Sequence, residues 1–195
     1  MKFLLFASIV LLMNLSASFS ADFKKGVDEY NKQNYLNAFT EWMPLAKKGN
    51  IAAQYNIGRM FYLGQGVPKD YNKAIKWFEL SAKKGYSDAQ VFIGNMYDRG
   101  HGVLKNFKVA AKWFKIASEQ NNAMAQSKLG VLYLKGEGVI KDQTKAYMWF
   151  NISAANGNET SAKIRDLIEK KMSSDEISFA QKLSRECIKK QYKNC

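Results

Sequence analysis

Histidine, cysteine and proline are scarce in this sequence, which has one histidine, two cysteines and two prolines among 195 residues. The single histidine, His101, is distant along the chain from Cys187 and Cys195, so the three or four ligands of a zinc site are not available. His101 also lies between two glycines, at a place where the sequence elsewhere has Gln65 or Glu137, which indicates a solvated loop tip and not a catalytic base. No Gly-x-Gly triplet is followed by the G-K-[ST] of a phosphate-binding loop. The sequence therefore predicts that the protein is not an enzyme and that it holds no metal and no cofactor.

Proline is limited to Pro44 and Pro68, whereas alanine, leucine, lysine and glutamine are abundant. This composition favours helices over strands, so we expect an all-α fold. Lysine and arginine together number 30 and aspartate and glutamate 17, so the net charge is +13. The excess lysines occur singly and in pairs along the whole chain. This distribution favours acidic partners by long-range attraction, but it is also typical of solvated helix faces.

Beyond the first twenty residues, the sequence has no apolar run of the length that spans a membrane. Residues 1–20 combine a lysine near the start, an apolar run up to Leu15 and small residues at Ser18 and Ser20. This pattern predicts a signal peptide that is cleaved before Ala21; the alternative is an uncleaved signal anchor. We therefore expect a periplasmic or secreted protein that does not span the membrane after cleavage, has a net charge of +12 and has no nucleic-acid partner.

The strongest feature is an internal repeat with a period of 36 residues. Three units share the order Ala-Gln, apolar-Gly, aromatic, Gly-x-Gly-Val, Ala and Trp-Phe, without an insertion. In the first unit these residues are Ala53-Gln54, Ile57-Gly58, Phe61, Gly64-x-Gly66-Val67, Ala74 and Trp77-Phe78. A fixed period of this length is typical of repeat architectures, in which neighbouring units bury each other's apolar faces.

Recurring polar residues and glycines mark the ends of two helices in each unit. In the first unit we expect helix A over residues 53–63 and helix B over residues 71–84. Gly58 lies in the middle of helix A, where it costs about 1 kcal/mol relative to alanine, so we expect it to allow close packing on helix B. The expected N-caps of helix B are Asp70, Asn106 and Asp142. The expected left-handed residues after helix B are Gly49, Gly85, Asn121 and Gly157.

These patterns resemble the tetratricopeptide repeat, and the extra length in the Gly-x-Gly-Val loop makes them resemble the Sel-1-like repeat family. The second unit departs from the family pattern at Asn106, Ser118 and Asn121. The resemblance implies an α-solenoid of stacked antiparallel helix pairs in a right-handed superhelix, and a scaffold function. Some cysteine-rich members of the family bind or hydrolyse β-lactams, but the cysteine pair that they carry in each repeat is absent here.

The ends of the chain depart from the repeat, as capping units do. Near the C-terminus, Ser173 or Ser174 is expected to cap a last helix over residues 175–190. The expected segments are a signal peptide at 1–20, an N-terminal capping helix pair at 21–49, repeats at 50–85, 86–121 and 122–157, and C-terminal capping helices at 158–195.

On helix A, the positions opposite the packed residues change from unit to unit. They are Tyr55, Arg59 and Tyr62, then Val91, Asn95 and Asp98, then Ser127, Val131 and Leu134. A fixed core with a changing surface indicates a binding face on a scaffold, and tyrosine and arginine are common interface anchors. The leading hypothesis is therefore a scaffold or adaptor with a protein partner, in the bacterial envelope or outside the cell. The alternative is a face that is only exposed to solvent.

A second hypothesis is a basic adaptor for an anionic polymer such as peptidoglycan, lipopolysaccharide or a glycosaminoglycan. It is supported by the positive charge and by the lysines of helix B, namely Lys73, Lys76, Lys108, Lys112 and Lys115. Affinity for such a polymer falls steeply with salt, which separates the two hypotheses.

Cys187 and Cys195 are the only cysteines, and an exported protein meets an oxidising compartment, so we expect a disulfide between them. In a continuous helix their Cα atoms would be about 12 Å apart, beyond the limit of about 7 Å for a disulfide. The helix must therefore end near Lys190, and the chain must turn back. The alternative is two free thiols.

Overall fold

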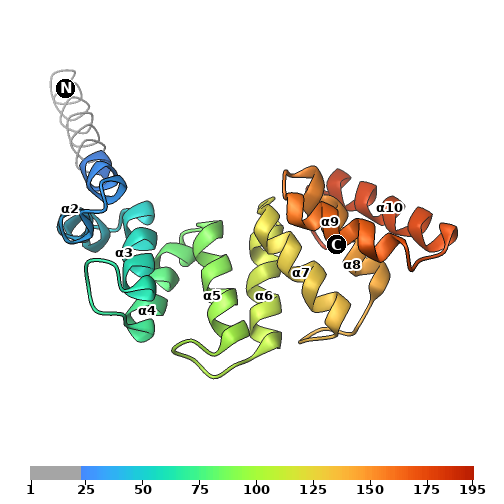
Figure 1. Ribbon diagram of the computed structural model, residues 1–195, viewed down its shortest axis with the longest axis horizontal. Coiled ribbons are helices and arrows are strands. Elements are labelled where there is room, and N and C mark those ends of the chain that lie inside the picture. The colour runs from blue at the N-terminus through green and yellow to red at the C-terminus, as the bar shows by residue number, and fades with distance from the viewer. Residues whose placement is uncertain (1–22) are drawn as a thin grey trace, which may run out of the picture. The chain divides into compact units, whose positions relative to one another are not determined.

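The computed structural model describes residues 23–195, and all regular secondary structure in this range is helical. The predicted signal peptide and its cleavage site lie outside the described residues. Residues 23–31 are helical and are followed by the helices labelled in Figure 1. Their bounds are α2 Tyr35–Lys47, α3 Ile51–Leu63, α4 Tyr71–Lys83, α5 Ser87–Arg99, α6 Phe107–Ser118, α7 Ala123–Lys135, α8 Gln143–Ala155, α9 Glu159–Glu169 and α10 Ser174–Lys189. The all-α class expected from the sequence is confirmed.

The chain forms two compact units, one that ends at Lys84 and one that spans Gly85–Cys195. In the first unit α3 packs against both α2 and α4. In the second unit α5 packs on α6, α6 on α7 and α7 on α8, and α8 also contacts α9 and α10. Helix hairpins are therefore stacked within each unit, as expected for an α-solenoid.

The helix ends follow the expected polar residues. Each cap of helix B accepts a hydrogen bond from the backbone N–H three residues later. The distances are 2.9 Å from Lys73 to Asp70, 3.1 Å from Val109 to Asn106 and 2.9 Å from Lys145 to Asp142. The closing residues are left-handed, with φ of 93° at Gly49, 89° at Gly85, 62° at Asn121 and 88° at Gly157. Helix α3 begins two residues earlier than expected because the Asn50 side chain caps it, accepting from the Ala53 N–H at 2.9 Å.

Two Gly-x-Gly-Val loops, those that contain Gly66 and Gly138, also touch the preceding hairpin of their own unit. A Cβ atom at Gly66 would lie 2.6 Å from the carbonyl carbon of Tyr35, at the start of α2. Gly138 approaches the backbone of Phe107, at the start of α6, in the same way. A side chain at either glycine would collide with a helix backbone, so each loop packs closely on the first turn of an earlier helix B.

The glycine in the middle of helix A brings the two helices of each hairpin together, as expected. A Cβ atom would lie 2.8 Å from Phe78 at Gly58, 2.5 Å from Phe114 at Gly94 and 2.9 Å from Phe150 at Gly130. The three phenylalanine rings are fully buried. In the first hairpin Gly26 has the same relation to the buried Trp42, whose indole N–H donates to the Phe23 carbonyl at 3.1 Å. A tryptophan there replaces the phenylalanine of the later repeats.

Two of the three recurring glutamines, Gln54 and Gln126, link successive hairpins within a unit. All three are buried, with exposed fractions of 4% at Gln54, 3% at Gln90 and 0% at Gln126. Gln54 Nε2 donates to the Ala46 carbonyl at 3.1 Å, and Gln126 Nε2 donates to the Ser118 carbonyl at 3.5 Å. Gln126 Oε1 accepts from Asn156 Nδ2 at 2.9 Å. These bonds satisfy polar groups at the ends of neighbouring helices, which explains why the residue recurs with the repeat.

The last helix is capped by Ser173 and not by Ser174. The Ser173 hydroxyl accepts from the Glu176 N–H at 3.3 Å, and the Glu176 carboxylate accepts from the Ser173 N–H at 2.8 Å. The Ser173 N–H and the Ser173 hydroxyl both donate to the Glu176 carboxylate, which lowers the pKa of Glu176. Two reciprocal bonds of this kind form a capping box, which fixes the start of α10.

Beyond α10 the chain turns back on the helix. Gln191, Tyr192 and Asn194 have positive φ values of 51°, 64° and 54°. The turn brings Cys195 to Cys187, with the Cα atoms 5.4 Å apart, and a disulfide joins the two residues. Cys187 is buried in the core of the second unit, so the disulfide fixes the last residues against this core.

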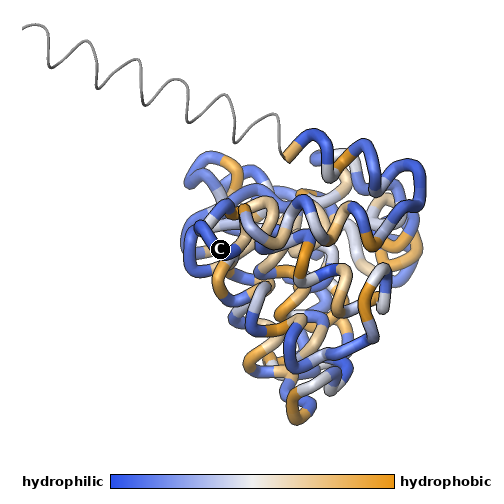
Figure 2. Tube along the Cα trace, turned by 90° about the vertical axis from the view of Figure 1, so that its left-hand side faces the viewer, coloured by the Kyte–Doolittle hydropathy of each residue, from blue (hydrophilic) through white to orange (hydrophobic). Residues whose placement is uncertain are grey.

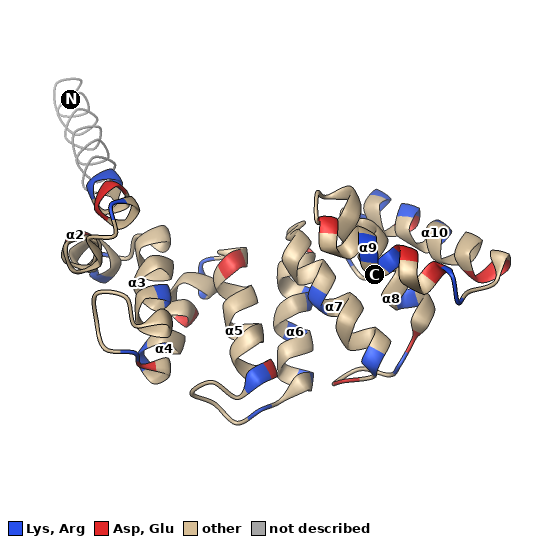
Figure 3. Ribbon diagram, viewed as in Figure 1, with Lys and Arg blue, Asp and Glu red and all other residues tan. Residues whose placement is uncertain are grey.

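Apolar and polar residues alternate along the helices in Figure 2, and lysine or arginine occurs on every helix from α2 to α10 in Figure 3. Within residues 23–195, none of the helices has both the length and the apolar character that crossing a bilayer requires.

Candidate binding faces

Helix α3 places three of the expected site residues, Tyr55, Arg59 and Tyr62, in one row, because they are spaced by four and three positions. The guanidinium carbon of Arg59 lies 5.7 Å from the ring centroid of Tyr55 and 5.7 Å from that of Tyr30. Arg59 Nη2 also donates to the Tyr30 hydroxyl at 3.5 Å. Aromatic rings attract a cation through their negative faces, so Arg59 is held between two tyrosines. We call Tyr30, Tyr55, Arg59 and Tyr62 the α3 face.

Tyr30 was not among the residues expected at this face, because it lies in the first hairpin, outside the repeat. Its ring centroid lies 5.2 Å from Tyr35 and 5.6 Å from Trp42. Its hydroxyl donates to Gln65 Oε1 at 2.7 Å. Gln65 is thus half-buried and hydrogen-bonded, which corrects the expectation that its loop position is a solvated tip. The packing around Tyr30 fixes the ring against which Arg59 rests.

The other two tyrosines of the α3 face are half-buried and also packed. The Tyr62 and Tyr71 rings are 5.1 Å apart and tilted by 56°. The Tyr55 ring lies 6.0 Å from that of Phe78. Contacts of this kind restrict the rotamers of the tyrosines, so a partner would meet side chains that are already ordered.

In the second unit, helix α5 carries the expected row Val91, Asn95 and Asp98. Val91 is only 5% exposed and belongs to the buried cluster that includes Ala111 of α6 and Leu129 of α7. The expectation that Val91 presents its side chain on a surface is therefore wrong. The physical reason is that the stacking of a further hairpin covers this part of α5, and residue spacing within one helix does not reveal such coverage.

Asn95 and Asp98 are half-buried. The Oδ1 atom of Asn95 is buried and has no hydrogen-bond partner among the described residues. Asp98 attracts Lys128 of α7 electrostatically, which raises the pKa of Lys128, but burial of the lysine has a larger and opposite effect. The pKa of Lys128 is consequently lower than its ordinary value of 10.5.

Helix α7 carries the third expected row, Ser127, Val131 and Leu134, and all three side chains are half-buried. Val131 and Leu134 pack against the buried cluster of α8, α9 and α10. Leu134 also lines a cavity of about 470 Å³ between α7 and α9, together with Ile164 and the exposed Leu167. The α7 row therefore ends in an apolar groove.

Among residues 23–195, no three histidine, cysteine, aspartate or glutamate side chains are grouped so that they could hold a metal ion. His101 follows Gly100 in its loop and is half-buried.

Stacked helix hairpins with a 36-residue period and a glycine contact inside each pair define an α-solenoid repeat protein. The Sel1 repeat family model matches residues 51–86, 87–122 and 123–158. The chain belongs to the Sel1 repeat family, whose members are generally non-enzymatic scaffolds for protein–protein interactions.

Solved structures of similar proteins support the same architecture. A Sel1 repeat protein from Oxalobacter formigenes is 34% identical, with a TM-score of 0.68 over 73% of this chain and 58% of that chain. A protective antigen present in uropathogenic Escherichia coli strains, with an SLR fold, is 27% identical, with a TM-score of 0.75 over 88% of this chain and 38% of that chain. Cysteine rich protein B of Helicobacter pylori is 20% identical, with a TM-score of 0.55 over 66% of this chain and 96% of that chain, and shares the fold.

The chain thus spans 58% and 38% of the length of the first two structures. No curated protein sequence matches it significantly.

Proposed function

We propose that the protein is a non-enzymatic scaffold that binds another protein through the α3 face. The observation that carries this proposal is the position of Arg59 between the rings of Tyr30 and Tyr55, 5.7 Å from each. Arginine and tyrosine are enriched among the residues that dominate binding energy at protein interfaces. A cation already fixed between two rings loses little side-chain entropy when a partner contacts it, which favours affinity.

We further propose that the groove of α7 and α9 provides a second contact site for a protein. Leu134, Ile164 and Leu167 offer apolar contacts there, while the exposed Lys141 and Lys170 also line the groove. An apolar centre with a polar rim is typical of protein-binding surfaces. Asn95, Asp98 and Ser127 remain candidates for polar contacts in this unit.

The proposed location is the bacterial envelope or the exterior of the cell. It is supported by the disulfide between Cys187 and Cys195, since disulfides persist in oxidising compartments. Bacterial relatives with the same fold and the signal-like sequence of residues 1–20 also favour export. Intact mass measurement of protein recovered from the envelope or medium should give a chain that starts at Ala21, whereas a chain that retains Met1 would argue against a cleaved signal.

Site-specific photo-crosslinking tests the scaffold proposal. The crosslinker p-benzoylphenylalanine would replace Tyr62 on the α3 face or, as a control, Leu80 on α4 of the same unit, which is 44% exposed. We expect a defined protein adduct from position 62 and none of the same mass from position 80. Identical adducts from both positions, or no protein adduct from position 62, would count against the α3 face.

The second candidate is an adaptor for an anionic polymer, which is supported by the +13 charge of the full sequence and by the exposed lysines of α4 and α6. Binding to a purified glycosaminoglycan or to lipopolysaccharide that weakens steeply between low and high salt would favour this candidate.

A further inference from the structure

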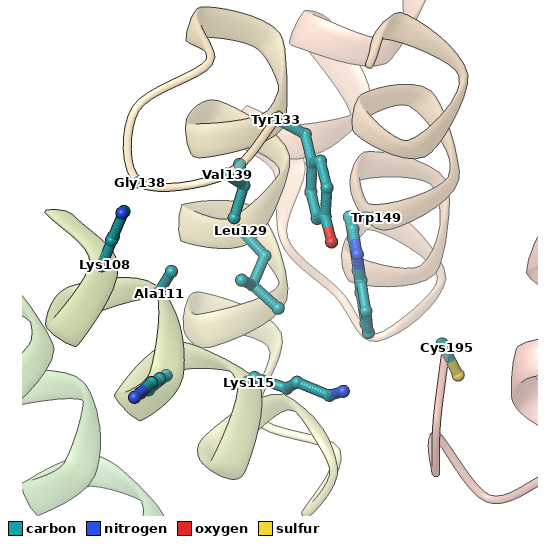
Figure 4. A pocket seen from close by; sticks show the side chains of 10 residues that line it. Lys108, Ala111, Lys115, Leu129, Tyr133, Gly138, Val139, Trp149 and Cys195 are labelled. Carbon is teal, nitrogen blue, oxygen red and sulfur yellow. The ribbon is translucent and has the colours of Figure 1, made fainter. Parts of the chain in front are cut away.

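The second unit has a cavity of about 290 Å³ that is lined by no residue of the α3 face or of the groove of α7 and α9 (Figure 4). Helices α6, α7 and α8, the loop between α7 and α8, and the last residue of the chain contribute to its walls. The lining residues are Lys108, Ala111, Lys112, Lys115, Leu129, Tyr133, Gly138, Val139, Trp149 and Cys195. Five of these residues form an apolar floor, namely Ala111, Leu129, Tyr133, Val139 and Trp149.

The apolar floor is fixed by the core of the unit. Leu129 is 3% exposed and Trp149 is 2% exposed, and both belong to the same buried cluster. Tyr133 and Val139 pack against that cluster. Cys195 closes one side and is held there by its disulfide to Cys187. The floor is therefore formed before any ligand arrives, as is usual for small binding sites.

Three lysines of α6 form the opposite wall. Lys108, Lys112 and Lys115 are spaced by four and three positions, so they lie on one side of the helix. All three are exposed, and none of them takes part in a salt bridge among residues 23–195. Glu119, which follows the same helix, pairs with Lys193 and not with these lysines; its Oε2 atom lies 4.0 Å from Lys193 Nζ. In Figure 4 the Lys115 amine points toward the side of the pocket where Trp149 lies.

We propose that this pocket binds a short acidic peptide segment through one apolar side chain, with the flanking carboxylates on the three lysines. The cavity is at the small end of the range for ligand sites, about 300–1,000 Å³, so it suits a single anchor side chain. The lysines span about 10 Å of helix at 1.5 Å per residue, which an extended peptide covers in about three residues at 3.3 Å each. Acidic residues on both sides of the anchor would therefore reach Lys108 and Lys115.

The geometry favours a peptide over a polysaccharide or a lipid. Sugar rings stack on open aromatic faces, but Trp149 is almost completely buried and offers only a small part of its surface. A sulfated polymer would use charge alone and would leave the apolar floor unfilled. A cavity of about 290 Å³ is also too small to enclose the acyl chain of a membrane lipid. The inference concerns a surface other than the α3 face, so it stands or fails independently of the proposed function.

The test uses a fluorescein-labelled peptide, Asp-Asp-Leu-Asp-Asp with a blocked C-terminus, titrated with the folded protein and followed by anisotropy. Two control peptides replace the leucine by serine or the four aspartates by asparagine. The protein variants are the triple change Lys108→Gln, Lys112→Gln and Lys115→Gln, and Ala111→Leu, which fills the pocket and keeps the charges. A triple change with the same charge loss on the other unit, Lys73→Gln, Lys76→Gln and Lys83→Gln, is the control.

We expect saturable binding of the leucine peptide and a dissociation constant that rises about tenfold or more for each control peptide. The α6 triple variant and Ala111→Leu should weaken binding to a similar extent, and the α4 triple variant by less than about twofold. The control peptides test the wild-type protein, so the result does not depend on the folding of Ala111→Leu.

Equal binding of the serine peptide, or equal weakening by the two triple variants, would overturn the proposal. So would the absence of binding at millimolar peptide. The proposal would also be overturned if the peptide does not bind but heparin or phosphatidylglycerol vesicles do, and if the Ala111→Leu variant loses that binding. This result would assign the pocket to a polymer or a lipid.

Discussion

A Cβ atom at Gly94 would lie 2.5 Å from Cε1 of Phe114, a ring that is completely buried. The same relation holds between Gly58 and Phe78 in the preceding repeat. The position of helix A on helix B in each repeat therefore depends on a missing side chain, and the stability of the solenoid should be most sensitive at this contact.

The first prediction concerns this contact. Gly94→Leu should lower the free energy of unfolding by about 3 kcal/mol or more, because an overfilled core cannot relax around the Phe114 ring. Arg99→Leu adds the same side chain at an exposed position of the same helix and should change stability by less than about 0.5 kcal/mol. Urea unfolding followed by circular dichroism measures both. Equal losses of stability would refute the role given to Gly94.

The second prediction concerns the start of α6. Asn106→Ala should cost about 1 kcal/mol of unfolding free energy, because the Val109 N–H loses its acceptor. Asn106→Asp keeps an acceptor of the same size, like that of Asp142 in the next repeat, and should retain most of the stability. Thermal melts of the three proteins compare them directly. If the alanine and aspartate variants melt together, the cap contributes nothing at this site.

The third prediction concerns pH. Burial lowers the pKa of Lys128 in the folded protein below 10.5, its ordinary value. Between the lowered pKa and 10.5, the unfolded chain binds more protons at this site than the folded chain, so the contribution of Lys128 makes stability rise with pH. Lys128→Met removes this rise and should be more stable than the wild type at pH 7.

Urea unfolding at pH 7.5 and at pH 10 measures the effect as the difference in unfolding free energy between the wild type and Lys128→Met. The difference should shrink as the pH rises, since the wild type loses its buried charge. Lys163→Met, at an exposed position of α9, is the matched control and should show no such trend. A difference for Lys128→Met that does not change with pH would contradict the assigned pKa direction.

The fourth prediction concerns the C-terminal disulfide. A closed ring from Cys187 to Cys195 should contribute about 2.5 kcal/mol in the chain-entropy model. Reduction should therefore lower the melting temperature of the wild type, whereas Cys195→Ser should melt at the lower temperature with or without reductant. Intact mass after alkylation shows the state of the thiols. Two alkylated cysteines in exported protein that was never reduced would rule out a disulfide in the native protein.

The fold could be predicted from the sequence because each helix end has its own local signal. Asp70, Asn106 and Asp142 cap their helices as expected, and Gly58 has the packing role that its position indicated. These features depend on residues that are near one another in the sequence. The expected start of α3 differs by two residues from the observed one, because the Asn50 side chain caps the helix before the apolar pattern begins.

The candidate faces could be predicted only in part, because their exposure depends on contacts between hairpins. The periodicity placed Tyr55 and Arg59 correctly on one side of α3, but it placed Val91 on a surface although the next hairpin buries it. Tyr30 was missed because it belongs to the irregular first hairpin and reaches Arg59 only through folding. The pocket beside Trp149 combines three helices, a loop and the chain end, which no sequence motif records.

The central claim is that Arg59, held between two tyrosines, anchors a protein partner. The most direct test is the affinity of the partner recovered by crosslinking at position 62 for the wild type, Arg59→Ala and Lys76→Ala, measured by isothermal titration calorimetry together with each melting temperature. The account predicts that Arg59→Ala weakens binding by about 2 kcal/mol, roughly thirtyfold, while Lys76→Ala changes it little and both proteins melt near the wild type. Unchanged affinity of Arg59→Ala, or a loss of affinity that is matched by unfolding, would contradict the claim.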